Sequence, residues 1–528
     1  MRAPCDEAVI RSGGREVPCG ERTRPWILTA TILGSSMAFI DSTVVNVALP
    51  AMQGSFHATV VDVQWVVESY GLFLGALILV GGSLGDLFGR RTIYVVGVAI
   101  FAVASAGCGF ASNIHQLIVA RSIQGVGAAL LVPGSLAIIS TSFDEKSRGQ
   151  AIGTWSGSTA ITTAIGPVLG GWLVEHASWR WAFFINLPIA ASVIAISLWR
   201  IPESRPTAGR IDWIGALFAT LGLGGLVYGF LESVNLGWTN RLVFGSLIVG
   251  FGGLITFVFV EARLPSPMVP LTLFRSQRFS GANLLTFLLY AAVGIFFFLF
   301  PLNLIQVQRY SPTAAGIAIL PFILLMFLLS RWAGGLVARY GSRVPLMVGP
   351  LIAAIGFALF YVPTVGDSYW KSFFPAIMVL GFGMAVTVAP LTTVVMNSVK
   401  EDSAGTASGI NNTVARVAGV LAIAVLGIVM VKAFSFRLDR GLAGLSLPSY
   451  IRQEVQANEI KLAGLQLPAG LDPTANAAIQ ESVREAFVYG FRIVMSICAG
   501  LSLASAAVAW LMIPPEHDRP RLPADSSS

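Results

Sequence analysis

Three ionisable side chains interrupt long apolar segments in the first quarter of the chain. Asp41, Glu68 and Arg121 each stand among mostly apolar neighbours. A charge inside a membrane-spanning helix is costly, so such residues are by default candidates for function. With a helical rise of about 1.5 Å per residue, they lie roughly 8–12 Å from the same end of their segments. Charges at one depth on three helices are expected to pair across a central cavity.

The chemistry that these residues support is reversible proton binding. We expect Asp41 to be the main proton carrier and Arg121 to set its proton affinity, because burial favours the neutral form of a carboxyl and a nearby cation favours the charged form. A change in their separation would couple proton binding to a change of conformation. The alternative is a static pair that only holds two helices together. Glu68 is a second proton site, a binder of cationic substrates, or a residue near the outer headgroups in contact with water.

The elements that must position these residues are membrane-spanning helices. The 528-residue chain is 55% hydrophobic and 12% charged, with a mean hydropathy of +0.74, whereas soluble domains carry about 25% charged residues. A spanning helix needs about 20 apolar residues. By that measure the apolar runs predict fourteen spans, at residues 26–49, 63–83, 92–111, 114–139, 150–174, 181–200, 212–231, 242–262, 281–301, 313–336, 344–363, 371–396, 406–431 and 488–513.

The basic residues indicate how the helices are oriented. Short loops rich in Lys and Arg alternate with loops that have few, which is the bias that marks cytoplasmic loops. It predicts that both termini are cytoplasmic and that the chain lies in the inner (plasma) membrane. The net charge of +7 is therefore a topology signal, and no nucleic-acid partner is expected. The 4 Cys residues lack metal-ligand spacing, so neither a metal site nor a cofactor is predicted.

An internal repeat divides the chain. The small-residue pattern of 125–153 recurs at 381–409, and repeated halves are the usual build of secondary transporters. The predicted organisation is six, two and six helices: a cytoplasmic tail at 1–25, a first bundle at 26–200, an inserted pair at 212–262, a second bundle at 281–513 and a cytoplasmic tail at 514–528. The second bundle includes a long outer loop at 432–487. A polar helical stretch near 472–486 suggests a helix lying on the outer membrane surface, and the alternative is docking of a periplasmic adaptor protein.

The loop after the second span reads Gly82-Ser-Leu-Gly-Asp86-Leu-Phe-Gly89-Arg90-Arg91. A tight glycine turn with one acid and two bases could latch the two halves in one state and release them in the other. The alternative is a plain basic cytoplasmic loop. The second copy, at 334–343, lacks the acid, so an asymmetric latch is expected. This loop resembles the signature loop of the major facilitator superfamily.

Three further stretches resemble the fourteen-helix drug:proton antiporters of this superfamily, the EmrB/QacA type. They are Asp41-Ser-Thr-Val-Val-Asn46-Val-Ala-Leu-Pro50, Arg121-Ser-Ile-Gln124-Gly125, and an antiporter motif on Gly153, Gly166, Pro167, Gly170 and Gly171. Thr162 stands where that motif usually has another glycine. The resemblance implies a major facilitator fold of fourteen spans, proton coupling through the three membrane charges, and export. Asn46, Gln124 and Arg416 are further candidates for the cavity lining.

The sequence thus predicts an all-α membrane protein, a multidrug efflux antiporter that exports small amphipathic or cationic molecules in exchange for protons. Its expected partners are the substrate, protons and the lipid bilayer, with a periplasmic adaptor as a further candidate. Alternatives on the same fold are an exporter or symporter of one metabolite or lipid, and outside transport a membrane sensor. The sequence has no nucleotide-binding loop and no soluble catalytic domain, so an enzyme is not predicted. Fold alone does not separate the transport alternatives.

Overall fold

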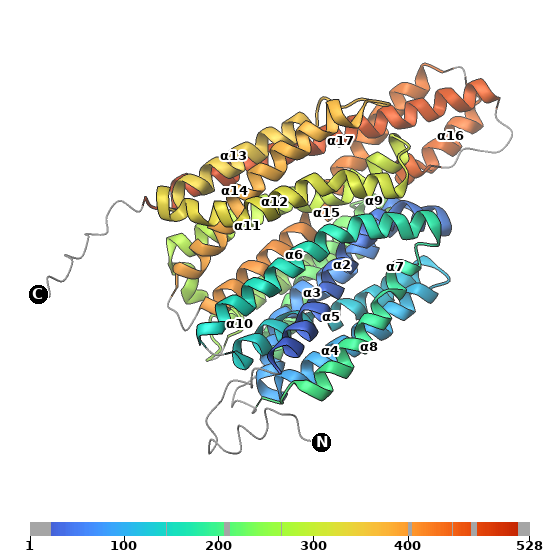
Figure 1. Ribbon diagram of the computed structural model, residues 1–528. Helices are drawn as coiled ribbons and strands as arrows, with labels where there is room; N and C mark the ends of the chain where they lie inside the picture. The colour runs from blue at the N-terminus through green and yellow to red at the C-terminus, as the bar shows by residue number, and fades with distance from the viewer. Residues whose placement is uncertain are drawn as a thin grey trace, which may run out of the picture.

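The computed structural model describes residues 23–143, 145–204, 212–265, 267–399, 404–445, 447–465 and 472–515, and this part contains helices and no strand (Figure 1). The first half comprises α2 (Arg24–Phe56), α3 (Val60–Phe88), α4 (Arg90–Phe110), α5 (Ile114–Ser142), α6 (Glu145–His176), α7 (Trp181–Phe184) and α8 (Asn186–Arg200). The inserted pair is α9 (Trp213–Leu236) and α10 (Arg241–Glu261). The second half comprises η1 (Leu271–Arg275), α11 (Gln277–Leu302), η2 (Asn303–Val307), α12 (Pro312–Tyr340), α13 (Arg343–Leu359), η3 (Tyr369–Phe373), α14 (Phe374–Asn397), α15 (Ala404–Ala443), α16 (Ser449–Ala457), η5 (Glu459–Gly464) and α17 (Pro473–Met512).

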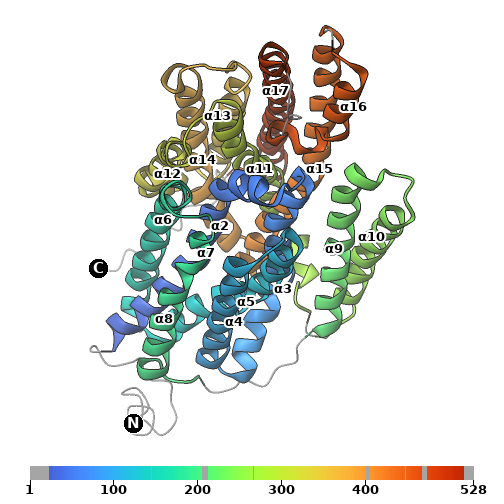
Figure 2. The same cartoon turned by 90° about the vertical axis from the view of Figure 1, so that its right-hand side faces the viewer.

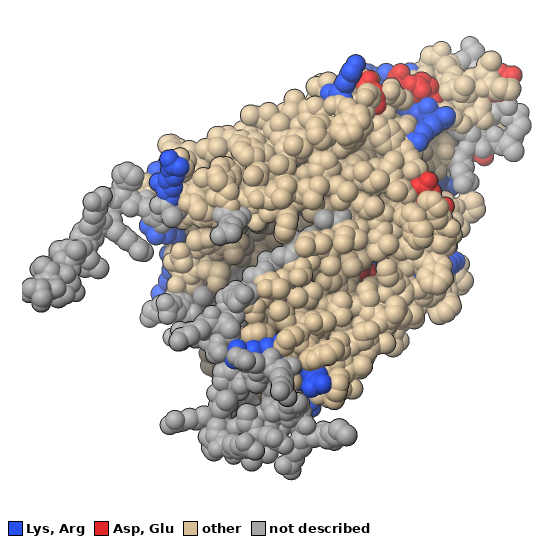
Figure 3. All heavy atoms as spheres, in the orientation of Figure 1, with Lys and Arg blue, Asp and Glu red and all other residues tan. Residues whose placement is uncertain are grey.

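The apolar runs of the sequence become long helices. Within the described residues, 12 helices are long and apolar enough to cross a membrane. All the predicted spans overlap a helix, although α13 is an apolar helix of only 17 residues and α6 is not among the 12. In the view of Figure 3, charged side chains gather at the two ends of the molecule and the band between them is almost free of charge.

The helices of the two halves pack in the same order. In the first half α2 packs on α6 and α8, while α5 packs on α3 and α4. In the second half α11 packs on α15 and α17, while α14 packs on α12 and α13. This matching order is what duplication of a six-helix unit produces. Figure 1 shows the two halves as separate layers, the first below the second.

The halves meet along two helix pairs, α6 with α12 and α3 with α15. We call the end of the bundle that carries α16 the outer end, following the predicted orientation. Here Gly171 of α6 lies against the Pro312 carbonyl of α12. Gln306 Nε2 donates to Gln53 Oε1 (2.7 Å), and Gln53 Nε2 donates to the Lys461 carbonyl (3.0 Å). These contacts between α2, η2 and η5 close the outer end in this conformation.

The long outer loop contains more helix than expected. α15 continues to Ala443 and α17 begins at Pro473. The polar stretch near 472–486, expected as a separate helix on the membrane surface, is the first part of α17, so that prediction was wrong. Asp472 caps the new start by accepting a hydrogen bond from the Thr474 backbone N–H (3.1 Å). A spanning helix that extends beyond the bilayer is no longer constrained to be apolar, which is why hydropathy did not detect this segment.

The inserted helices α9 and α10 form a pair on one flank of the molecule (Figure 2). Asp212 begins α9 by accepting from the Gly215 N–H (2.6 Å). Glycines bring the two helices together: a Cβ built on Gly225 would lie only 2.6 Å from the Ser246 carbonyl oxygen. α9 packs against both α3 and α15, whereas α10 packs mainly on α9. The pair therefore covers one of the two lines along which the halves meet.

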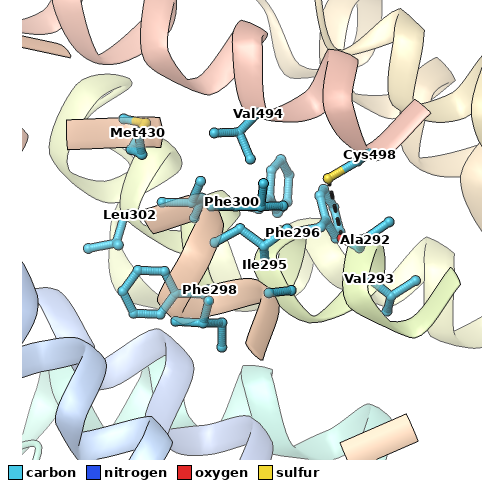
Figure 4. Close-up of a cluster of buried hydrophobic side chains, with 14 of the residues drawn as sticks. Ala292, Val293, Ile295, Phe296, Phe298, Phe300, Leu302, Met430, Val494 and Cys498 are labelled. Carbon is cyan, nitrogen blue, oxygen red and sulfur yellow. Dashed lines mark hydrogen bonds between the residues drawn. The ribbon is translucent and has the colours of Figure 1, made fainter. Parts of the chain in front are cut away.

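The core of the second half is aromatic. Phe296, Phe298 and Phe300 of α11 are each at most 1% exposed, and Phe296 and Phe300 stack with ring centroids 4.9 Å apart. Figure 4 shows Phe296 and Phe300 together near Val494 and Cys498 of α17, while Phe298 points away from them. The three rings are thus packed within the protein.

Candidate functional site

Asp41 and Arg121 form an ion pair inside the first half. Asp41 lies on α2 and Arg121 on α5, and Arg121 Nη1 is 2.5 Å from Asp41 Oδ2. Both side chains are at most 1% exposed. Asn113 caps the start of α5 by accepting from the Gln116 N–H (2.9 Å), which fixes where this helix begins. The sequence prediction that these two charges pair is confirmed.

Three neighbouring side chains complete the site around the pair. Gln124 Nε2 and Asn186 Nδ2 donate to Asp41 Oδ1, at 2.8 and 3.2 Å. Both amides also donate to Ser105 Oγ, at 3.3 and 2.9 Å. The carboxylate thus accepts hydrogen bonds from one guanidinium and two amides that α5 and α8 supply.

Arg121 is held on its other sides as well. Its Nε donates to the Val66 carbonyl (3.1 Å), and its Nη1 also donates to Gln124 Oε1 (2.7 Å). The guanidinium carbon lies 4.3 Å from the centre of the Tyr70 ring, a favourable cation–π distance. Tyr70 is 5% exposed and covers the cation. Neither partner of the pair is therefore open to water, and proton exchange at Asp41 requires a rearrangement of the helices.

Glu68 does not join the other two charges. Its side chain is 0% exposed, and neither carboxyl oxygen has a hydrogen-bond partner in the described residues. It lies on the face of α3 that packs on α15, since Gln64 and Gly71 on that face contact Ile423 and Val420. The expectation that all three charges pair at one depth was wrong for Glu68, and so was the alternative of contact with outer water. Arg121 bonds to the Val66 carbonyl and lies over Tyr70, so Glu68 is at the level of the pair but on another face of α3.

The three predicted cavity residues have different surroundings. Gln124 is 0% exposed and belongs to the shell of the ion pair, so its expected position on a cavity wall was wrong. Asn46 is half-buried and donates to the Ser42 carbonyl of its own helix (3.1 Å). Arg416 is half-buried on α15, and a Cβ built on Gly75 of α3 would lie 3.8 Å from its Cβ. It therefore faces the first half across the α3–α15 line.

The loop that carries Gly82, Asp86, Gly89, Arg90 and Arg91 is tied down within the first half. Arg90 Nη2 lies 2.9 Å from Asp86 Oδ1, and Arg91 Nε lies 3.5 Å from Glu203 Oε2. Gly89 has φ of +99°, and a Cβ there would meet the carboxyl of Glu203. Within the described residues, the hydrogen-bond partners of Arg90 and Arg91 all belong to the first half, so latching to the second half stays a prediction. Sequence reasoning missed Glu203, whose only signal is an acid directly after the sixth span.

The glycines of the fifth span permit two close helix contacts. Gly166 and Gly170 lie against Thr43 and Val44 of α2. On the other side of α6, Gly171 faces Pro312, and the Pro167 carbonyl faces Gly316 of α12. Close approach without side chains is the ordinary use of small residues in membrane helices. Gly153 lies in α6, but its surroundings are outside the described part of the chain.

Asn186, Ser105 and Tyr70 were not singled out as site residues from the sequence. Each is an uncharged side chain in an apolar segment, so none stands out as a costly charge does. A signal existed for Asn186, which lies in the run Trp179-Arg-Trp-Ala-Phe-Phe-Ile-Asn186-Leu-Pro188 that fits the resembled family. All three contact the Asp41–Arg121 pair or its amide partners.

The chain is similar to known proteins both in sequence and in fold. The family model described as "Major Facilitator Superfamily" matches residues 31–423. The multidrug resistance protein Stp of Mycobacterium tuberculosis is 34% identical over 501 residues, which is 93% of this chain and 93% of that protein. The tetracenomycin C resistance and export protein of Streptomyces glaucescens is 33% identical over 513 residues, 94% of each chain. A bacterial homologue of the human lysosomal transporter Spinster, solved in an inward-facing and occupied conformation, has a TM-score of 0.63 at 18% identity and covers 93% of this chain and 97% of its own, which supports the fold.

Proposed function

Because the chain belongs to the major facilitator superfamily, we propose that it is a proton-coupled antiporter that exports small amphipathic molecules. The observation that carries this proposal is the sealed Asp41–Arg121 pair with its two amide donors. An ion pair removed from water costs free energy that its own attraction barely repays. A site that contains one therefore needs a reason beyond stability, and proton exchange supplies it.

In the proposed mechanism Asp41 alternates between two environments. With the outer end closed, the proposed cycle has Asp41 without a proton and paired with Arg121. Opening toward the outside admits water to the pair, and a proton on Asp41 removes its attraction for the guanidinium. Closing again with the neutral acid carries that proton inward, and release to the inside restores the pair. Glu68, buried without a hydrogen-bond partner, is proposed to hold a second proton, because an unpaired carboxylate at that position would be very costly.

The finer parts of the proposal concern topology and export. We propose fourteen spans, with α6 and α13 joining the 12 that length and hydropathy identify, and both termini in the cytoplasm. Tight packing of α6 on α2 and α12 would keep ions from leaking between the halves. Export rests on the relatives, whose names include multidrug resistance, tetracenomycin C resistance and export, and puromycin resistance. The inner (plasma) membrane is the proposed location.

Asp41→Asn tests the proton carrier directly. The variant keeps the shape of the side chain but cannot bind and release a proton, so proton-driven efflux should stop while exchange of labelled substrate across the membrane continues. The measurement is uptake of fluorescein and rhodamine 123 into inside-out vesicles, where export leads into the lumen, with and without a protonophore. Asp439→Asn, an exposed acid on α15, is the matched control. Efflux by Asp41→Asn that is as fast as the parent and still stopped by the protonophore would refute the role of Asp41.

A further inference from the structure

Arg416 is a cation without a counter-ion in the middle of the bundle. The described residues offer it neither a carboxylate nor a hydrogen bond, and it is half-buried. An unpaired charge at membrane depth is expensive and is by default functional.

The register of α3 and α15 shows where this side chain lies. Gln64 Nε2 donates to the Ile423 carbonyl (3.3 Å) near the outer end. Gly75, three turns further along α3, lies opposite Arg416. With a rise of about 1.5 Å per residue, Arg416 is roughly 10 Å deeper than Ile423. It therefore lies inside the bundle, on the face of α15 that meets the first half, and not against lipid.

Among the described residues, no acid near the middle of the membrane is free to pair with a bound cation. Asp41 is taken up by Arg121 and two amides, and Glu68 is 0% exposed. In the described helices of the second half, the acids of α15 and α17 lie near the outer end, at Asp439, Glu481 and Glu485. Arg121 is covered by Tyr70, so of the charges discussed here Arg416 is the one that is not fully buried.

We propose that Arg416 binds an acidic group of the exported molecule, so that the substrates are amphipathic anions and not the cations expected from the sequence. Carboxylates, phenolates, phosphates and sulfonates all fit, because the guanidinium offers paired N–H donors to such groups. A cationic compound would leave Arg416 unpaired and add a like charge beside it, which disfavours binding. This inference rests on the proposed export function.

Two dyes of matched shape and opposite charge test the inference. Fluorescein is an anion and rhodamine 123 a cation on the same ring system, and binding of each to the purified full chain is measured by fluorescence anisotropy. Hydrogen bonds to a charged group contribute about 1.5–3 kcal/mol, which is roughly 10- to 150-fold in Kd. We expect Arg416→Gln to weaken fluorescein binding by that factor and to leave rhodamine 123 binding unchanged or tighter. Arg416→Lys should recover part of the loss.

Lys432→Gln is the matched control, since Lys432 is an exposed cation on the same helix, and it should bind both dyes as the parent does. A second measurement needs no variant: 1-pyrenebutyrate should compete with fluorescein, and its methyl ester should compete at least ~10-fold less well. The inference is overturned if the parent prefers rhodamine 123 or binds no fluorescein. It is also overturned if Arg416→Gln weakens both dyes equally, or if acid and ester compete alike.

Binding separates this inference from the proposed function, because it needs no proton gradient. Charge-selective binding without proton-driven efflux would refute the antiport proposal and leave the anion site standing. Proton-driven efflux of both dyes at equal rates, unaltered in Arg416→Gln, would refute the anion site and leave antiport standing.

Discussion

Gly316 on α12 offers a direct way to disturb the closed outer end. A Cβ built on Gly316 would lie 2.6 Å from the Pro167 carbonyl carbon and 3.0 Å from the Val168 nitrogen, both on α6. Contacts below 3.0 Å force something to shift, so Gly316→Val pushes α6 and α12 apart. Overpacking of this kind costs about 1–3 kcal/mol. The halves separate at the outer end when a transporter opens outward, so the added methyl groups destabilise only the closed state. The ratio of outward-open to closed molecules should therefore rise roughly 5- to 150-fold.

The assay is the reaction rate of one cysteine at the outer end. Gln306→Cys, introduced into a chain without its native cysteines, replaces a residue that bonds to Gln53 across the closure. A membrane-impermeant maleimide should label it faster in Gly316→Val. The control is Gly334→Val on the same helix, where a Cβ would meet no atom within 4 Å. Equal labelling rates in the two folded variants would refute the reasoning.

Three further predictions concern single contacts. Asn186→Leu removes a hydrogen bond to Asp41 and should lower the Tm of the purified protein and slow proton-driven efflux, whereas an unchanged efflux rate would exclude Asn186 from the site. Glu203→Gln weakens the ion pair with Arg91 and the hydrogen bonds that Glu203 accepts from the backbone N–H groups of Arg91 and Thr92. It should lower the free energy of unfolding, measured by thermal unfolding, by only about 1 kcal/mol, because the side chains are partly exposed. The Thr364 N–H, which donates to Asp367 (2.7 Å), holds the pKa of Asp367 below its ordinary value of 3.8. Asp367→Asn should therefore lower Tm at neutral pH, and the difference should vanish as the pH falls through the lowered pKa; a difference that persists in acid would contradict this.

The spanning helices could be predicted because the bilayer imposes length and apolarity on every one of them. The same reasoning ends where the membrane ends. Residues 432–443 are helical because they continue α15 outward, yet their polar composition made them read as loop. The helix expected near 472–486 continues into the last span as part of α17. The predicted helix ends were therefore less accurate for α15 and α17, which extend beyond the apolar runs, than for the shorter spanning helices.

The site was predictable in its charges and not in its geometry. Asp41 and Arg121 could be found because a charge among apolar residues is conspicuous, and their depths agreed. Which face of a helix a residue occupies relative to distant neighbours depends on tertiary packing, and Glu68 and Gln124 were misplaced for that reason. Asn186 could not be joined to Asp41 from spacing, since 145 residues separate them in the chain.

The one-sided position of α9 and α10 makes the two flanks of the molecule unlike. On one flank α9 bridges α3 and α15, so a compound dissolved in the lipid meets the inserted pair before it meets either half. On the other flank α6 and α12 meet each other directly. The α3–α15 line is thus covered by an added pair of helices, whereas the α6–α12 line is not. The two bundles are similar to each other, but the inserted helices α9 and α10 make the two flanks of the transporter different.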